Sequence, residues 1–280
     1  MLRGTNPYDQ AFYADVSRMA RDSAKAIVPI VVELVQPTSV IDVGCGTGTW
    51  LTAFVEQGVT TYLGIDGDYV PRDALSIDAS HFVAADLRRP VSVGHTTYDL
   101  AVSLEVAEHL PEEAGDVLVD SLTRLAPVVL FSAAIPGQGG VDHINERWQD
   151  YWAERFALRR FVPLDAIRPR VWNNEKVAWF YAQNTLLYAH EDAVAASDRL
   201  RKEVESRERL LLNVVHPRPY LALGEEASRR SSQAEYFSRN RHLSFSIVVR
   251  MIPGLLARAL SRRVRRALSR VTGRHTEEPS

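Results

Sequence analysis

The sequence predicts an α/β protein in which a parallel strand leads through a glycine turn into a helix. Residues 40–43 form a short β-branched apolar run, which is typical of a buried parallel strand. The sequence GCGTG of residues 44–48 breaks this run, and residues 47–57 follow as a predicted helix. A second apolar run over residues 61–65 ends in Asp66. This succession of strand, helix and strand indicates the α/β class.

The glycine turn is the first candidate for a ligand site. Gly44, Gly46 and Gly48 allow the backbone to approach a ligand closely, and the amides that begin the helix would face that ligand. A dinucleotide-binding loop would have a third glycine in the spacing GxGxxG, but Thr49 stands there. Asp42 precedes the turn and would repel a pyrophosphate while attracting a cation. S-adenosylmethionine (SAM), which carries a sulfonium and an ammonium and no phosphate, fits these charges.

Two further acids follow the next two apolar runs. Asp66 lies about twenty residues beyond the glycine turn, where a carboxylate can accept hydrogen bonds from both hydroxyls of a ribose. Asp86 follows residues 81–85, a placement that suits contact with an adenine edge. The three acids together predict a site for a cationic nucleoside.

Three motifs together resemble the class I SAM-dependent methyltransferase family: DVGCGTG at residues 42–48, GID at 64–66 and AADL at 84–87. The resemblance covers roughly residues 38–190. It implies a doubly wound, mostly parallel seven-stranded sheet with helices on both faces, and SAM over the carboxyl ends of the strands. Carried over position by position, it assigns the methionine end of SAM to Asp42, Gly44, Gly46 and Gly48, the ribose to Asp66, and the adenine to Asp86 with Leu87.

Polar residues follow the predicted fourth strand, residues 98–103, where the family places substrate-facing chemistry. Glu105, Glu108 and His109 share one face if this segment is helical. Two carboxylates and an imidazole could bind a divalent cation or supply a general base. Some RNA 2'-O-methyltransferases and quinone-pathway O-methyltransferases that the chain resembles use an ExxEH stretch for a metal. The other interpretation is that these residues shape the SAM pocket, with Glu105 beside the cofactor, and cap the next helix.

A glycine-rich loop, residues 136–148, follows the predicted fifth strand and carries His143. Because the ordinary pKa of histidine lies near neutrality, an imidazole beside the acceptor can remove the proton that methyl transfer to oxygen or nitrogen releases. His143 is therefore the leading candidate for the catalytic base, and His109 is the second. His143 could instead order the loop through Asp142 and Asn145, or add a fourth ligand to the ExxEH stretch.

The predicted methyltransferase domain of residues 38–190 carries extensions at both ends. Residues 1–37 are expected to form a helical cover, with two helices over residues 8–35. Residues 191–246 are expected to form a helical and loop extension, and residues 247–280 a basic amphipathic helix and tail.

The antiparallel end of the sheet is expected between residues 159 and 190. The aromatic and β-branched run of residues 177–189 is the strongest strand candidate in that region. Trp172, Asn173 and Asn174 precede this run, and they could line the acceptor site or, in the case of the two asparagines, form a turn.

Composition restricts the setting in which the protein works. The one cysteine of the 280-residue chain, Cys45, excludes a disulfide framework or a zinc cluster of cysteines and suits a reducing cytoplasm. The sequence contains no apolar run of about eighteen residues, so no membrane span is predicted. Residues 236–276 contain ten arginines and no acid, which predicts peripheral contact with the anionic inner membrane surface. Two alternatives are that this basic segment docks onto residues 1–235 of the same chain, in which acids outnumber bases, and that it binds a nucleic acid.

These observations predict a SAM-dependent methyltransferase that acts on an oxygen, or alternatively a nitrogen, of a small molecule or saccharide such as a natural product or envelope glycan. One competing hypothesis is a metal-assisted RNA 2'-O-methyltransferase that uses the ExxEH stretch. Another is a non-catalytic protein that binds SAM as a regulatory ligand. The acceptor itself is not predicted, because a fold carries little information about substrates.

Overall fold

A computed structural model describes residues 10–94, 96–205 and 210–239, with side chains described between residues 18 and 232 of those ranges. The chain divides into two compact units, Met1–Tyr220 and Leu221–Ser280. The first unit contains all the described strands, and the second begins inside helix α9 (Pro217–Arg239). The predicted basic helix of residues 247–280 lies outside the described residues.

A seven-stranded sheet forms the centre of the first unit, in the order β3-β2-β1-β4-β5-β7-β6. The strands are β1 (Ser39–Val43), β2 (Thr61–Asp66), β3 (Phe82–Ala84), β4 (Leu100–Leu104), β5 (Val128–Ser132), β6 (Phe161–Leu164) and β7 (Leu186–His190). The pairs among β1 to β5 are parallel, whereas β7 runs antiparallel to both β5 and β6. The predicted doubly wound, mostly parallel seven-stranded sheet is confirmed.

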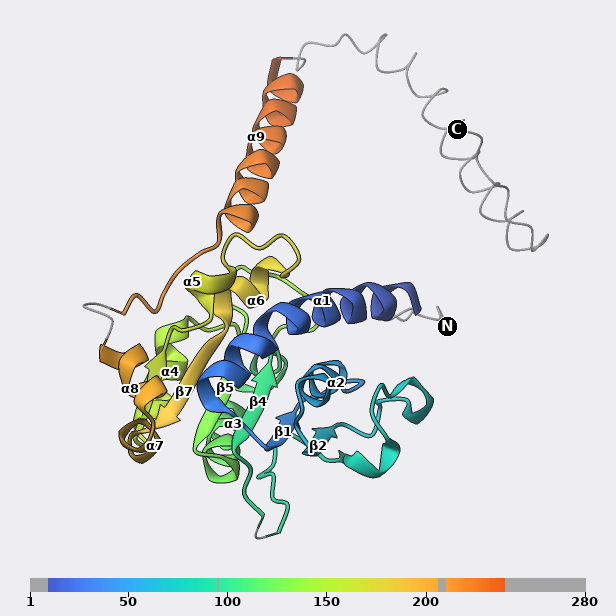
Figure 1. The fold of residues 1–280 in the computed structure, drawn as a ribbon. Coiled ribbons are helices and arrows are strands. Elements are labelled where there is room, and N and C mark those ends of the chain that lie inside the picture. The colour runs from blue at the N-terminus through green and yellow to red at the C-terminus, as the bar shows by residue number, and fades with distance from the viewer. Residues whose placement is uncertain (1–9, 95, 206–209, 240–280) are drawn as a thin grey trace, which may run out of the picture. The chain divides into compact units, whose positions relative to one another are not determined.

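Helices cover both faces of the sheet (Figure 1). The described helices of the first unit are α1 (Gln10–Val35), α2 (Thr49–Glu56), α3 (Glu112–Leu125), α4 (Gln149–Ala157), α5 (Arg168–Val171), α6 (Trp179–Asn184), α7 (Glu191–Ala196) and α8 (Asp198–Glu205), with single 3-10 turns η1 (Arg72–Ala74), η2 (Ala79–His81) and η3 (Ala107–His109), while α9 extends into the second unit. Because strand side chains alternate, Val40 packs into one core with α1 and α2, whereas Ile41 packs into the other with α3 and α4. The two cores pack on opposite faces of the sheet and include residues of the parallel strands β1, β4 and β5.

One helix, α1, replaces the two helices that the sequence predicted over residues 8–35. Pro29 lies inside it on the exposed side, and the helix continues past it. A proline in a helix interior costs about 3 kcal/mol. Burial of Ile27, Val28 and Val31 against the sheet offsets this cost.

The strand predicted over residues 177–189 is only half correct. Residues 179–184 form helix α6, and β7 begins at Leu186. Val177 and Tyr181, four residues apart, are both buried, and the amide of Ala182 donates to the carbonyl of Ala178. Tertiary packing of this helical face therefore overrides the β-propensity of the aromatic run. The helix brings polar residues to the carboxyl ends of the strands, where Figure 1 shows α5 and α6.

Residues 211–216 form an extended segment between α8 and α9. Side-chain hydrogen bonds attach this segment to the predicted methyltransferase domain of residues 38–190. The guanidinium of Arg168, 2% exposed, donates to the carbonyls of Leu212 and Leu211 at 2.7 and 2.6 Å. The amide of His216 donates to Oε1 of Gln183 in α6 at 2.8 Å. The contacts place residues 211–216 against α5 and α6. Within the described residues, no helix is long and apolar enough to cross a membrane.

Candidate functional site

The glycine turn lies between β1 and α2 with all three glycines in the left-handed region, at φ values of 89° for Gly44, 52° for Gly46 and 83° for Gly48. A Cβ on Gly44 would lie 2.3 Å from Cγ2 of Val106, so the turn has room for glycine alone there. The amide of Gly44 donates to the carbonyl of Ile65 at 2.7 Å, which ties the turn to the end of β2. The turn is thus held in the shape that lets a ligand approach its backbone.

Asp66, at the carboxyl end of β2, has both carboxylate oxygens engaged by the protein. Oδ2 accepts from the amide of Gly46 at 2.7 Å, and Oδ1 accepts from the amide of Gly67 and the hydroxyl of Tyr69, both at 2.6 Å. The Tyr69 ring lies directly over Gly67, where a Cβ would come within 2.1 Å of the ring. A phenol hydroxyl therefore occupies the type of position that the resemblance assigned to a ribose hydroxyl.

Asp42, on β1, is 2% exposed, and its Oδ2 atom has no hydrogen-bond partner. Burial, followed by the negative charge of Asp66, raises the pKa of Asp42 well above its ordinary value. A buried acceptor without a donor is costly, and a cation that delivered an N–H would relieve both the charge and the missing hydrogen bond. The ammonium of SAM meets that requirement, so the residues present fit this cofactor.

Asp86, which the sequence placed at the adenine, is a surface residue paired with Arg88. Its two oxygens accept from Nε and Nη2 of Arg88 at 2.8 and 2.9 Å, and these bonds lower the pKa of Asp86 to about 2. Leu87 beside it is buried at 7% exposure. Leu87 offers an apolar surface near the end of β3, while the carboxylate of Asp86 is already occupied by an arginine.

Glu105 follows β4 and has a positive φ of 54°. Its carboxylate accepts from Nδ2 of Asn184 at 3.1 Å and from Nε2 of Gln138 at 2.8 Å. Burial raises the pKa of Glu105, and the hydrogen bonds from Asn184, Ser132 and Gln138 oppose that effect. These amide donors hold Glu105 toward α6.

Glu108, His109 and His143 come together beyond β4 and β5. One ligand atom from each lies within 4.8 Å of the other two. Glu108 is 0% exposed, and neither of its carboxylate oxygens has a hydrogen-bond partner. Burial, followed by the charge of Glu105, raises the pKa of Glu108 well above its ordinary value. Glu108 is therefore the member of the trio whose polar atoms lack partners.

The four metal-ligand candidates from the sequence therefore do not all assemble. The ExxEH stretch is not a continuous helix, because only the 3-10 turn η3 forms after Glu105 with its positive φ. Glu105 consequently points to its amide partners, and among the described residues the group that could hold a metal is Glu108, His109 and His143. Oxygen and nitrogen ligands of this kind suit a divalent cation such as Mn²⁺, Fe²⁺ or Zn²⁺.

The two histidines face each other edge to face, with ring centroids 4.8 Å apart and an interplanar angle of 87°. Burial, followed by the neighbouring His143, lowers the pKa of His109, which favours its neutral form. The imidazole of His143 also contacts the carboxylate of Glu146 in the same loop, with Nδ1 and Oε1 3.1 Å apart.

Sequence reasoning missed three polar residues of α6: Tyr181, Gln183 and Asn184. Tyr181 packs edge to face on Trp50, with ring centroids 5.1 Å apart. Burial, followed by the nearby charge of Glu105, raises the pKa of Tyr181, so its hydroxyl remains protonated. The signal that could have found these residues is the helical spacing of Val177 and Tyr181, which the strong strand propensity of the segment concealed.

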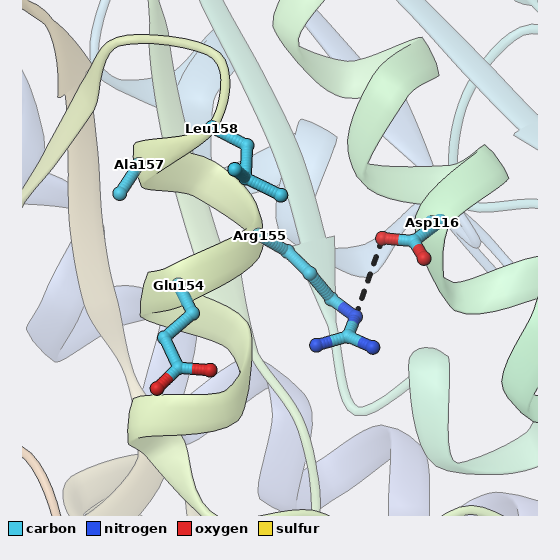
Figure 2. Close-up of a pocket in the computed structure, with 5 residues that line it drawn as sticks. All are labelled: Asp116, Glu154, Arg155, Ala157 and Leu158. Atoms are coloured by element: carbon cyan, nitrogen blue, oxygen red, sulfur yellow. Dashed lines mark ion pairs between the residues drawn. The ribbon is translucent and has the colours of Figure 1, made fainter.

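A cavity of about 490 Å³ lies elsewhere, on the helical layer that includes α3 and α4, and is lined by Asp116, Glu154, Arg155, Ala157 and Leu158. Figure 2 shows Arg155 and Asp116 pointing toward one another, with Nε and Oδ1 3.2 Å apart. The guanidinium of Arg155 also stacks on the ring of Tyr151, 3.3 Å from its centroid. None of the predicted site residues lines this cavity.

A family model described as a methyltransferase domain matches residues 15–174, more than half of the chain. No curated protein matches the sequence. Among solved structures, a sugar N-methyltransferase from Streptoalloteichus sp. ATCC 53650 superposes with a TM-score of 0.51 at 14% identity, over 68% of this chain and 98% of that one.

Two other solved structures are similar to the chain. An amino pentose methyltransferase from Micromonospora echinaspora has a TM-score of 0.48 at 15% identity, over 67% of this chain and 100% of that one. A protein from Nostoc punctiforme described as a putative O-methyltransferase has a TM-score of 0.48 at 14% identity, over 64% of this chain and 58% of that one. The family match, together with the strand order and the glycine turn, shows that the chain belongs to the class I SAM-dependent methyltransferase family.

Proposed function

We propose that the protein transfers a methyl group from SAM to an oxygen of a small molecule or saccharide, with His143 as the general base. The observation that carries the proposal is the pair His109 and His143 beside the buried, unpartnered carboxylate of Glu108. This cluster adjoins Glu105, which follows the carboxyl end of β4, while the turn with Asp42 and Asp66 follows β1 and β2. We therefore divide the site into a cofactor side, made by the glycine turn with Asp42 and Asp66, and an acceptor side, made by Glu108, His109 and His143.

On the cofactor side, Asp42 accepts from the ammonium of the methionine end, and Gly44, Gly46 and Gly48 let the backbone approach it. Asp66 accepts from the ribose hydroxyls, and Leu87 supplies an apolar contact for the adenine. Asp86 can accept from the adenine only when its ion pair with Arg88 opens. Glu105, held by its amide partners, adds negative charge beside the cationic end. When bound, SAM supplies an electrophilic methyl carbon attached to its sulfonium.

On the acceptor side, His143 takes the proton of the attacking hydroxyl, and His109 helps to position the acceptor. Methyl transfer is an in-line displacement, so the protein mainly aligns two groups and removes one proton. The rings of Trp50 and Tyr181 are buried and pack edge to face, and we infer that they help to exclude water from this region. A nitrogen acceptor is the alternative, and it needs the same alignment and a base only if the amine arrives protonated.

The first test is calorimetric titration of SAM and S-adenosylhomocysteine into EDTA-treated protein, with Asp42→Asn and Asp66→Ala as variants. We expect binding by the wild type and strong loss in both variants. Turnover is then followed as S-adenosylhomocysteine release with panels of phenols, sugars and amino sugars. Loss of turnover in His143→Ala with SAM affinity unchanged supports the base. Full turnover in His143→Ala refutes it, and SAM binding without any turnover favours the non-catalytic hypothesis.

A metal-assisted reaction is the second candidate, because Glu108, His109 and His143 bring three ligand atoms within 4.8 Å of one another. An RNA ribose hydroxyl or another hydroxyl could be the acceptor. Titration of Mn²⁺, Mg²⁺ and Zn²⁺ into EDTA-treated protein tests it, with Glu108→Gln as the variant and Glu105→Gln as the matched control outside the trio. Metal binding that Glu108→Gln abolishes and Glu105→Gln preserves supports this candidate. Absence of metal binding in the wild type rejects it.

A further inference from the structure

The glycine-rich loop after β5 folds around one carboxylate, that of Glu146. Oε2 accepts from the amide of Gly137 at 2.8 Å, and Oε1 accepts from the amide of Gly139 at 2.9 Å. Gly137 and Gly139 have positive φ values of 82° and 71°, which glycine adopts without strain. The two amides therefore converge on the same side chain, and the loop is closed by an internal anion rather than by a regular element.

The same carboxylate also contacts the imidazole of His143. Oε1 of Glu146 lies 3.1 Å from Nδ1, and the two side chains are 20% and 12% exposed. An ionised carboxylate can only accept, so Nδ1 must be the donor. Neutral His143 is then the tautomer with its proton on Nδ1, and its lone pair lies on Nε2.

The backbone of the loop limits where the His143 ring can lie. A Cβ on Gly140 would come within 2.3 Å of Nε2 and 2.5 Å of Cε1, so the ring occupies space that any side chain at position 140 would fill. On another side it meets the ring of His109, with centroids 4.8 Å apart. Glu146 thus holds Nδ1 of the His143 ring. Nε2 lies against the backbone of Gly140, which carries no side chain.

We propose that Glu146 is a positioning residue, which fixes the tautomer and orientation of His143 so that Nε2 is the basic atom of the site. The inference rests on the proposed function, in which His143 takes the proton of the acceptor. Glu146 does not touch the reacting atoms. It acts by holding Nδ1–H and by closing the loop from residue 137 to residue 146 around the ring, and its charge stabilises the imidazolium after proton transfer.

The decisive measurement is the tautomer of His143, read from long-range ¹H–¹⁵N spectra of ¹⁵N-labelled, EDTA-treated protein at a pH where imidazole is neutral. The signals of His143 are assigned by their loss in His143→Ala. We expect the wild type to show the Nδ1–H tautomer. We expect Glu146→Ala to shift toward the Nε2–H tautomer that histidine prefers in water. The exposed Glu113→Gln is the matched control and should leave the spectrum unchanged.

An Nε2–H tautomer in the wild type would overturn the proposal, and so would an unchanged tautomer in Glu146→Ala. The wild-type spectrum alone decides the matter if Glu146→Ala does not fold. Neither SAM nor an acceptor is needed, so failure here is separate from failure of the proposed reaction. When an acceptor is in hand, Glu146→Ala should lower kcat about 10- to 100-fold, as loss of an outer carboxylate partner does, with the KM for SAM unchanged.

Discussion

Glu105 accepts a hydrogen bond from Asn184 across 79 residues of sequence, with Oε1 and Nδ2 3.1 Å apart. The bond joins the carboxyl end of β4 to the last turn of α6. Nδ2 of Asn184 also donates to Oε1 of Gln138 at 2.9 Å, so one amide group serves the strand end and the glycine-rich loop together. The same side chain therefore connects the proposed cofactor side with the loop that carries His143.

Asn184→Leu should destabilise the SAM-free protein. It leaves the partly buried Glu105 with one donor fewer, and an unsatisfied buried acceptor costs up to about 1–3 kcal/mol. Urea unfolding measures the change. The exposed Asn173→Leu is the matched control and should stay within about 0.5 kcal/mol of the wild type. Equal stabilities of Asn184→Leu and the control would mean that Glu105 finds another donor.

Asp42→Asn should lose SAM affinity and yet stabilise the SAM-free protein. Burial disfavours the ionised form of Asp42, and each pKa unit of that shift costs about 1.4 kcal/mol at a pH above the raised pKa. Asparagine keeps the shape without the charge, so its Tm should rise. Asp99→Asn is the contrasting control, since Asp99 accepts from the amides of Thr38 and Ser39 at 2.8 and 2.9 Å and should be destabilised by the change. A lower Tm for Asp42→Asn would contradict the argument.

SAM binding should release protons through Asp42. In the free protein the pKa of Asp42 is raised, so the carboxyl keeps its proton above the ordinary value of 3.8. A bound ammonium favours the carboxylate and lowers that pKa, so the complex binds fewer protons than the free protein. Affinity must then increase with pH between the bound and free pKa values. Calorimetry in two buffers of different ionisation enthalpy measures the release by the wild type, and a count of zero protons released would contradict the argument.

The glycine turn and its acids were predictable because they are local: Asp42 lies next to the end of one apolar run and Asp66 ends the next, and parallel strands place their carboxyl ends on one edge. Asn184 was not predictable, because its role depends on α6, a helix formed against strong local strand propensity. The contact between Glu146 and His143 was not predictable either. The two residues are three positions apart in an irregular loop, where spacing does not indicate which side chains meet. Glu105 does not join Glu108, His109 and His143 because the backbone turns at its positive φ, which the residue type alone does not indicate.

Tyr69→Phe should tighten SAM binding. The hydroxyl of Tyr69 donates to Oδ1 of Asp66 at 2.6 Å, and a ribose hydroxyl that used this oxygen would have to displace it. A net hydrogen bond is worth about 0.5–1.5 kcal/mol, so affinity should increase roughly two- to tenfold. The exposed Tyr220→Phe is the matched control and should bind SAM as the wild type does. Weaker binding by Tyr69→Phe would show instead that the phenol contacts the bound cofactor.

Gly44→Ala should destabilise the SAM-free protein more than Gly46→Ala. Both residues have positive φ, so alanine at either position costs about 1–2 kcal/mol of backbone strain. At position 44 the new Cβ would also meet Cγ2 of Val106 at 2.3 Å, whereas nothing lies within 4 Å of a Cβ at position 46. Urea unfolding of the two variants isolates the steric contribution. Val106→Ala should recover part of the loss in Gly44→Ala and none in Gly46→Ala, and equal loss in the two glycine variants would mean that the turn shifts away from Val106.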